Sequence, residues 1–487
     1  MAFLSLPPQS TDFEKVTRIA RHVLHDRGFL VDLPRAAEDA AEHRRPELQA
    51  GARDLCDLPW SSIDNRESRD LDQIEWMEKL PDGRVRVLIG IADVASFVPV
   101  GGPVDAFAGA NTSTLYAGPL VFPMLPEILS VDRTSLLLEK ERFAMVTEYL
   151  VTDDGSVEEP KVYPARVTNH AQLVYEDVGA WLEGTPGAPA PPHGFEDQLR
   201  LQHQVARCLR KQRFERGALS FETVEARTVT LPDGSLELAV VQKNRARELV
   251  EDLMIAANNA TARYLDNHGL PSIRRIVKTP KRWSRIVELA AAHGTTLPAE
   301  PDPRALSAFL GKERARDATA FGDISLAVVK LLGPGEYHVA EPGKPHEGHF
   351  GLAVHDYTHS TAPNRRYADL VTQRLLFAAA LGAANPYPDG ALTAVAQRCT
   401  DKENDARAVE RTMRKVLAAI ALADHIGEEF DGVITGKADK GVFVRLLSPP
   451  AEGRIVRGED GVDVGDHVRV KLTATVPERG FLDFVRV

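Results

Sequence analysis

The first 60 residues carry the hydrophobic spacing of two short helices. Apolar side chains recur every three or four positions from Phe13 to Leu24, a capping box occupies residues 11–14, and Gly28 ends the pattern. A second helix is predicted from Pro34 to about His43. Two such helices can form a helix-turn-helix or winged-helix unit, or pack as an appendage on the next domain. The appendage is favoured, because the segment lacks a recognition-helix cluster of arginine, asparagine and glutamine.

Strand-like patterns follow these helices. A short β-like run ends at Ile63 and an apolar and acidic run begins at Ile74, while residues 84–98 alternate and then become continuously apolar. The last pattern is typical of a strand that enters a buried sheet. Asp93 lies within it, and a buried carboxylate needs a partner. We interpret Asp93 as a cap on neighbouring backbone N–H groups in preference to a support for nearby carboxylates.

Long helices and one stiff loop are predicted in the middle of the chain. The periodicity predicts helices over residues 195–215, 243–266 and 401–423. The first of these carries many basic side chains, which form either the wall of a channel or an ordinary solvated face. Prolines exclude a helix before Glu127, so residues 118–130 are predicted to be an apolar loop that can wall a cavity.

The last 60 residues change in character. Four or five short strands, separated by glycine and aspartate turns, begin at Phe430 and predict a small Greek-key barrel of the OB type. The chain as a whole is therefore predicted to be α+β. On the barrel, Phe443, Lys440, Arg445 and Lys471 would form a mixed aromatic and basic face suited to single-stranded nucleic acid.

Composition narrows the class of protein. Of 487 residues, 43% are hydrophobic and 26% charged, which is ordinary for a globular protein, and the net charge of −11 argues against a generally basic nucleic-acid binder. A polyanion site must then be a local basic channel. Three dispersed cysteines favour a reducing compartment, and no apolar run is long enough to span a membrane. We expect a cytoplasmic protein, without a membrane segment and monomeric.

The candidate chemistry begins with a cluster of carboxylates on one tight connection. Asp64 is followed by Asp70 and Asp72, between the two strand-like runs. Like charges at this density raise one another's pKa unless a cation lies between them. Mg²⁺ prefers such oxygen ligands, and two ions can serve phosphodiester hydrolysis. A solvated acidic turn is the alternative, because the spacing alone does not separate the two.

A second informative segment supplies cations. A turn around Pro363 places Arg365 and Arg366 at the start of a predicted helix. Guanidinium groups at a helix N-terminus favour a phosphate through bidentate hydrogen bonds and the helix dipole. His355 and His359 lie four residues apart, but zinc is disfavoured, because Pro363 follows closely and cysteine ligands are distant.

Taken together, these segments resemble the ribonuclease II family of RNB-type exoribonucleases. The resemblance spans about residues 57–424 and rests on residues 63–72, 91–94, 123–130, 216–220 and 357–370. It implies an RNB catalytic domain over 57–424, a mixed sheet with long helices around a central channel, between a helical N-terminal domain over 1–56 and an OB-fold barrel over 425–487. The implied activity is processive, Mg²⁺-dependent 3′-to-5′ hydrolysis of single-stranded RNA to nucleoside 5′-monophosphates, with Mn²⁺ as a possible substitute.

The resemblance also implies roles for individual residues. Metal ligands are expected at Asp64, Asp70, Asp72 and Gln73, and catalytic roles are expected for Asp70, Asp72 and Arg365. Substrate contacts are expected from Tyr116, Arg365, Arg366 and Glu410, with the Tyr116 ring against the terminal nucleotide. From the sequence around it alone, Tyr116 is interpreted as a packed aromatic side chain in preference to a base-stacking one.

The chain departs from the family pattern in several places. Gln73 stands where the family has a second consecutive aspartate, which removes one charge although the amide oxygen can still coordinate. Gly90 replaces a usual histidine, and a second aromatic of the base clamp is not evident. About 55 N-terminal residues stand where relatives carry two cold-shock barrels. An RNA-binding protein on a catalytically weak or inactive nuclease fold is therefore the alternative function.

Overall fold

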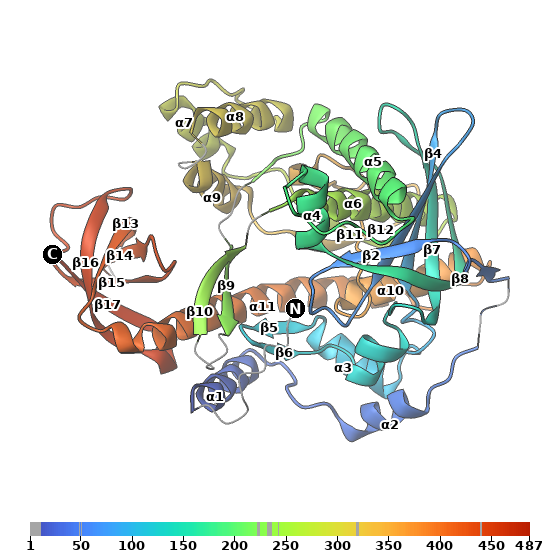
Figure 1. The fold of residues 1–487 in the computed structure, drawn as a ribbon, viewed down its shortest axis with the longest axis horizontal. Coiled ribbons are helices and arrows are strands. Elements are labelled where there is room, and N and C mark those ends of the chain that lie inside the picture. The colour runs from blue at the N-terminus through green and yellow to red at the C-terminus, as the bar shows by residue number, and fades with distance from the viewer. Residues whose placement is uncertain are drawn as a thin grey trace.

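The computed structural model describes residues 11–47, 49, 51–221, 225–230, 236–241, 243–317, 321–438 and 441–487. It has the predicted α+β organisation, with a central sheet, long helices around it and a separate C-terminal barrel (Figure 1). Within the described ranges, none of the helices combines the length and apolar character needed to cross a lipid bilayer.

The central sheet curls back on itself through one long strand. Its order is β1-β8-β2-β3-β4-β7, and β8 pairs with β7 as well as with β2. Strands β1 and β2 run parallel to β8, while the other pairs are antiparallel. The curled interior is filled by large apolar side chains, among them Trp60, Ile74 and Leu88. The strands are β1 (Arg53–Asp54), β2 (Trp60–Asp64), β3 (Gln73–Lys79), β4 (Val85–Ala92), β7 (Glu141–Val151) and β8 (Val157–Val174).

Helices cover the curled sheet from two sides. One apolar core forms where α4 (Tyr175–Glu183), α5 (Glu196–Glu215) and α6 (Arg245–Asn267) pack on the strands. A second core joins α3 (Pro103–Asn111) and α10 (Tyr367–Ala380) to the loop after β4. Helix α11 (Ala391–Ala421) is the longest at 31 residues and runs across the molecule toward the barrel (Figure 1).

Shorter elements complete the domain. A β-hairpin, β5 (Leu115–Ala117) and β6 (Leu120–Phe122), begins the proline-containing segment that the sequence predicted to be a loop. The helices between residues 283 and 332 form a small group that lies above the domain in Figure 1 and has its own apolar core. The remaining elements are η1 (Ile128–Arg133), β9 (Glu225–Thr230), β10 (Leu236–Val241), β11 (Ser272–Ile276), α7 (Trp283–Ala292), α8 (Pro303–Arg316), α9 (Phe321–Leu332), β12 (Glu336–Ala340) and η2 (Phe350–Leu352).

The two N-terminal helices form at the predicted positions but share no core with each other. Helix α1 (Thr11–Asp26) buries Val16 and Leu24 against Met413 of α11. Helix α2 (Arg35–His43) packs its two buried alanines into the core around α3 and α10. Each helix thus packs separately on the larger domain, as expected of an appendage rather than of a helix-turn-helix unit.

The C-terminal residues fold into a closed five-stranded barrel. Its order is β13-β14-β15-β17-β16, with β13 paired to β16. The strands are β13 (Glu429–Ala438), β14 (Gly441–Leu446), β15 (Glu452–Arg457), β16 (His467–Val476) and β17 (Phe481–Arg486). The short helix η3 (Ala423–His425) precedes β13, and η4 (Pro477–Arg479) connects β16 to β17. Side chains at the end of α11 enter the barrel core. The predicted OB-type fold is therefore present; Lys440 of its predicted binding face lies outside the described residues.

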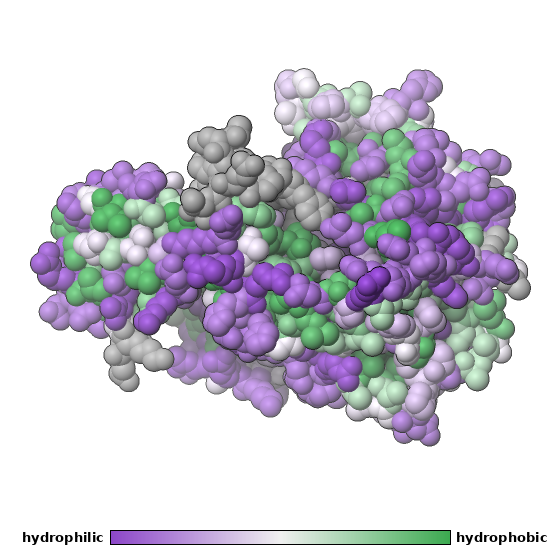
Figure 2. All heavy atoms as spheres, turned by 90° about the horizontal axis from the view of Figure 1, so that it is seen from below, coloured by the Kyte–Doolittle hydropathy of each residue, from purple (hydrophilic) through white to green (hydrophobic). Residues whose placement is uncertain are grey.

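One face of the molecule shows how hydrophobic and hydrophilic residues are mixed at the surface (Figure 2). On the side shown in Figure 2, hydrophobic patches are small and separated by hydrophilic residues, both on the barrel and on the larger domain. Phe481 and Val464 of the barrel are among the exposed large hydrophobic residues, at 53% and 60% exposure. Scattered exposure of this kind is ordinary for a folded protein.

Candidate active site

The predicted acidic turn connects β2 to β3, and hydrogen bonds hold its shape. Asp64 ends β2, and its Oδ1 accepts hydrogen bonds from the Asn65 N–H and the Ser68 hydroxyl, both at 2.7 Å. At the other end, the Asp72 carbonyl oxygen accepts from the Ala92 N–H of β4 at 2.9 Å. The turn is therefore fastened to strands on both sides, so its carboxylates have fixed positions.

Asp72 is the most deeply buried of the three aspartates, with 2% exposure. Its Oδ1 accepts from the Asn364 N–H at 3.1 Å, while its Oδ2 is buried without a hydrogen-bond partner. Burial raises the pKa of Asp72 to about 8; the nearby Arg365 opposes this rise and Asp70 adds to it. A carboxyl group in this state is incompletely compensated by the protein alone.

The other two aspartates belong to the same electrostatic cluster. Burial raises the pKa of Asp70, with Arg365 lowering it and Asp64 raising it. Burial raises the pKa of Tyr116 to about 12, and all three aspartates contribute to this rise. Asp64, Asp70, Asp72 and Tyr116 therefore lie within electrostatic range of one another, as the sequence predicted for the three carboxylates.

These residues line one cavity of about 370 Å³. Its acidic wall is the β2–β3 turn, including Gln73; a second wall is the β5–β6 hairpin with Tyr116, and a third is the N-terminal half of α6. Arg365 closes the remaining side. The cavity thus combines clustered carboxylates, aromatic rings and guanidinium groups, which suits an anionic ligand with a planar part once a cation compensates the carboxylates.

Arg365 reaches the cavity from the loop that precedes α10. Its Nε lies 3.7 Å from the Asp72 Oδ2, and its side chain is 46% exposed. The Arg365 carbonyl oxygen accepts from the Thr114 N–H at 3.0 Å, which fixes the loop to the segment that leads into β5. The guanidinium is therefore anchored through its backbone but remains accessible on one side.

Arg366, which the sequence predicted to contact substrate beside Arg365, is not among the residues that line this cavity. The Arg366 Nη2 donates to Asp369 Oδ1 at 2.7 Å, and Asp369 has no exposure. This ion pair raises the pKa of Arg366, although burial opposes the rise. The Nη2 of Arg366 is thus paired with a buried carboxylate of α10, and the side chain is 26% exposed.

Glu410 also lies apart from the cavity lining. It occupies an exposed position on α11, one turn before the buried Met413. Helix α11 does contact the β5–β6 hairpin, since a Cβ at Gly118 would come within 2.1 Å of the Leu417 side chain. Glu410 is therefore on an element that supports the cavity wall, without being part of that wall.

Three candidate functional residues were not identified from the sequence. Tyr175 and Arg247 line the cavity from α4 and α6, and the Arg247 guanidinium packs over the Tyr175 ring at 4.4 Å. Glu75 of β3 lies two residues beyond Gln73, has no exposure and has both carboxyl oxygens without a hydrogen-bond partner; burial raises its pKa to about 8. An acidic residue inside an apolar strand was the signal that could have identified Glu75.

Other expectations have clear outcomes. Asp93 is a backbone cap, as preferred, because its Oδ1 accepts from the Ser96 N–H at 3.0 Å. His359 is half-buried and its Nδ1 lies 2.8 Å from the Tyr337 hydroxyl, whereas the exposed His355 lies with His346 and Asp356 in a group whose possible ligand atoms are within 4.8 Å of one another. Gly90 faces the interior of the curled sheet, where a Cβ would come within 3.0 Å of Ile74; a side chain the size of histidine does not fit there.

The basic helix α5 is not a wall of the acidic cavity. Arg210 Nε donates to Asp252 Oδ2 at 2.8 Å, and Arg213 pairs with the other oxygen of the same carboxylate. Arg210 also pairs with Glu248 at 2.5 Å. Arg210 and Arg213 of α5 are therefore paired with carboxylates of α6 and do not face the acidic cavity.

Comparison with known proteins identifies the family. Residues 52–382 match the RNB domain, and residues 428–487 match the RNase II-type exonuclease C-terminal S1 domain. Ribonuclease R of Escherichia coli (strain K12) is 32% identical over 416 residues, which cover 82% of this chain and 50% of that protein. The chain spans about half the length of that protein and of the Ribonuclease R proteins of Shigella flexneri and Vibrio parahaemolyticus.

Solved structures agree on the fold. Mycoplasma genitalium RNase R in complex with ribose-methylated single-stranded RNA aligns with a TM-score of 0.86 at 23% identity, covering 97% of this chain and 78% of that one. Yeast Ssd1, described as a pseudonuclease, aligns with a TM-score of 0.70 at 16% identity, covering 91% and 55%. The RNB match extends over more than half of the residues, so the chain belongs to the RNB family and carries a ribonuclease II-type S1 barrel at its C-terminal end.

Proposed function

We propose that this protein is a metal-dependent 3′-to-5′ exoribonuclease that hydrolyses single-stranded RNA processively to nucleoside 5′-monophosphates. The observation that carries the proposal is the convergence of Asp64, Asp70 and Asp72 with Arg365 in one cavity. Phosphodiester hydrolysis requires an activated water and compensation of the charge that develops on the phosphate. Carboxylates that hold a cation, facing a guanidinium group, meet both requirements.

The residues present fit a hard divalent cation. The donor atoms are carboxylate oxygens with the amide oxygen of Gln73, a set typical of Mg²⁺ or Mn²⁺ sites. The buried, unpartnered Oδ2 of Asp72 is the atom that most needs a cation. When bound, such an ion acidifies water and offsets phosphate charge. Asp72 and Asp70 would hold it, with Asp64 and Gln73 completing the set.

The remaining cavity residues would position the RNA end. Arg365, partly exposed beside Asp72, would donate to the scissile phosphate and stabilise its developing charge. The ring of Tyr116 would pack against the terminal base, a contact worth about 1–3 kcal/mol. Arg366 would act indirectly, by holding Asp369 at the start of α10, and the S1 barrel would bind the strand upstream of the cavity.

A labelled substrate tests this function. The full chain is incubated with a 5′-labelled oligoribonucleotide and Mg²⁺, with and without chelator, and the products are resolved by length and by end-group chemistry. Progressive shortening from the 3′ end and chelator-sensitive release of 5′-monophosphates are expected. Asp72→Asn should abolish both, because it removes the charge while keeping the acceptor for the Asn364 N–H. A wild-type rate in Asp72→Asn would refute the assignment of the metal site.

A second candidate function is RNA binding without hydrolysis. Gln73 motivates it, because one negative charge is missing from the acidic wall, and the structural likeness to a pseudonuclease shows that the fold accommodates an inactive protein. In this case the same oligoribonucleotide would bind in a mobility-shift assay but remain intact with Mg²⁺ or Mn²⁺. A parallel strand of DNA shows whether recognition depends on the 2′-hydroxyl.

A further inference from the structure

A second pocket of about 290 Å³ lies on the opposite face of α6 from the acidic cavity. Val250 and Met254 of this helix line the acidic cavity, whereas Ile255, Asn259 and Arg263 line the second pocket. Asn259 follows Val250 by nine residues, or about two and a half helical turns, so the two side chains point in opposite directions. The second pocket is therefore separate from the site described above.

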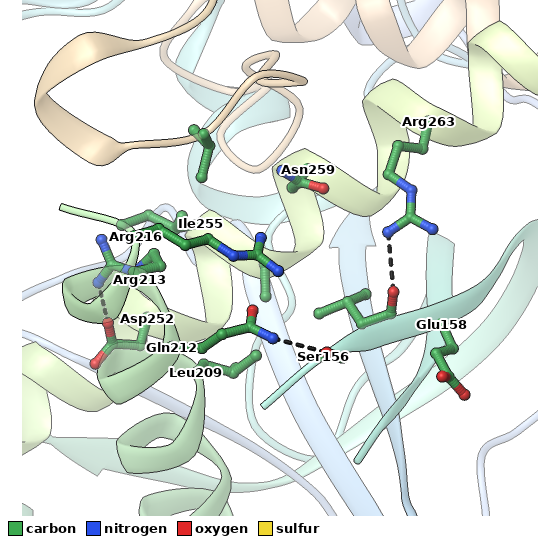
Figure 3. A pocket seen from close by; sticks show the side chains of 13 residues that line it. Ser156, Glu158, Leu209, Gln212, Arg213, Arg216, Asp252, Ile255, Asn259 and Arg263 are labelled. Atoms are coloured by element: carbon green, nitrogen blue, oxygen red, sulfur yellow. Dashed lines mark hydrogen bonds and ion pairs between the residues drawn. The ribbon is translucent and has the colours of Figure 1, made fainter. Parts of the chain in front are cut away.

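The second pocket is bounded by three segments. Figure 3 shows side chains from the end of α5, from α6 and from the start of β8 surrounding it, with the Arg216 side chain reaching between Asn259 and Gln212. Its apolar lining comes from Leu209, Ile255 and neighbouring residues. The Gln212 amide hydrogen-bonds Ser156 at 2.7 Å, which holds the end of α5 to the β7–β8 turn.

The charges around this pocket leave a local excess of positive charge. Its two carboxylates are compensated elsewhere: Asp252 is paired with Arg210 and Arg213, and Glu158 lies 3.5 Å from Arg84. Figure 3 also shows the Glu158 carboxylate pointing away from Gln212.

Two guanidinium groups of the pocket remain uncompensated. Arg216 and Arg263 have no carboxylate partner in the part of the chain that the structure describes. Arg263 has one hydrogen bond, from its Nη1 to the Val157 carbonyl oxygen at 2.9 Å. Its other N–H groups, those of Arg216 and the amide of Asn259 are available to a ligand.

The geometry points to a binding site for a small phosphomonoester, and we propose that this pocket takes one. Two guanidinium groups approaching from different elements, with an amide between them, match the donor pattern that binds a dianionic phosphate. The apolar side of the pocket would accept the body of the ligand, as in a sugar or nucleoside phosphate. The volume is at the lower end for ligand pockets, which favours a monomeric ligand over a nucleic-acid strand. The proposal does not depend on the nuclease activity proposed above.

Calorimetric titration of the full chain tests the proposal. Uridine 5′-monophosphate and inorganic phosphate are titrated separately in the presence of chelator, which keeps metal-dependent binding at the acidic cavity out of the measurement. Saturable binding is expected for the wild type. Arg216→Gln and Arg263→Gln should each raise the Kd about tenfold or more. Phosphate alone should bind more weakly than the nucleotide if the apolar wall contributes.

Two controls separate this pocket from other sites. Arg207→Gln removes one exposed positive charge from the same helix α5, outside the pocket, and should leave the Kd unchanged. Arg365→Gln removes one of the cations of the acidic cavity, which Arg69 and Arg247 also line, and should leave the Kd of this pocket unchanged. Loss of nucleotide binding in Arg365→Gln with full binding in Arg216→Gln would overturn the proposal, as would the absence of saturable binding by wild type.

One further comparison distinguishes a free phosphomonoester from a strand. An oligoribonucleotide without terminal phosphates is titrated into wild type and Arg216→Gln, in chelator. Equal affinities are expected for the two proteins. Weaker strand binding by the variant, together with unchanged mononucleotide binding, would assign Arg216 to the path of RNA and contradict the proposal. Thermal unfolding followed by circular dichroism confirms that each variant is folded; if Arg263→Gln unfolds, Arg216→Gln alone decides.

Discussion

Adjacent arginines with opposite environments allow a sharp test of the active site. Arg365 faces the cavity with its Nε 3.7 Å from Asp72, while Arg366 is paired with the fully buried Asp369 at 2.7 Å. We expect Arg365→Gln to lower kcat with little effect on folding, and Arg366→Gln to lower the free energy of unfolding. The sequence presents the two residues as a pair, so only the structure makes this distinction.

The expected size of each effect follows from the contacts. Solvent screens the interaction of the half-exposed Arg365 with Asp72, 3.7 Å away, so its loss should cost no more than about 1 kcal/mol of folding stability. A donor aimed at developing phosphate charge is worth about 10²- to 10³-fold in kcat. Removing Arg366 instead leaves a buried carboxylate uncompensated, which costs about 3–5 kcal/mol of stability.

The assay measures both quantities on the same three proteins. Single-turnover hydrolysis of a 5′-labelled oligoribonucleotide with Mg²⁺ gives the rate of the chemical step, and urea unfolding in chelator gives the free energy of unfolding. The reasoning would be refuted if Arg366→Gln lost activity by 10²-fold or more while unfolding like wild type. It would also fail if Arg365→Gln hydrolysed RNA at the wild-type rate.

Three further predictions follow from buried residues. Asp72→Asn should be no less stable than wild type in chelator, because it removes a buried charge, and should lose the rise in melting temperature that Mn²⁺ gives wild type; an equal rise in both proteins would contradict the metal site. Burial raises the pKa of Asp93 from 3.8 to about 6, so the stability that this group contributes is present below pH 3.8 and lost as the pH rises through about 6. Asp93→Asn should therefore gain stability relative to wild type between pH 4 and pH 7, by up to roughly 3 kcal/mol in denaturant unfolding, and a pH-independent difference would disprove the shift. Gly90→Ala should cost about 1–3 kcal/mol by the same method, because its Cβ meets Ile74 at 3.0 Å. Gly436→Ala, in strand β13, controls for the loss of a strand glycine, because its added Cβ meets nothing closer than the Phe443 ring at 3.8 Å.

Local patterns predicted the parts of the fold that depend on neighbouring residues. The helix around Leu253 and the aspartates of the β2–β3 turn were identified because periodicity and spacing are visible in a short window. The closure of the sheet was not predicted, since it depends on β8 pairing with both β2 and β7, which are about 80 residues apart in sequence. Helix α11 began ten residues earlier than predicted, at Ala391 rather than at residue 401.

The candidate site shows the same limit at the level of single side chains. Arg365 and Arg366 differ by one position, and the partner that separates them, Asp369, was read only as part of a helix. The sequence predicted Arg210 and Arg213 to lie on a channel wall or a solvated helix face, but in the structure both pair with Asp252 of α6. Residue type and spacing therefore identified the chemistry, whereas long-range pairing decided which groups remain available for it.

Helix α11 contacts both the barrel and the hairpin that forms one wall of the cavity. Its 31 residues form a rod about 46 Å long, with its end in the barrel core and Leu417 against the β5–β6 hairpin that carries Tyr116. Leu417 is followed directly by Ala418 and Ala419, which enter the barrel core, so a tilt of the barrel would reach the hairpin through adjacent residues at one end of the helix. RNA that binds to the barrel, far from the carboxylates, would thus alter the space beside Tyr116 that is available to the last nucleotide of the same RNA.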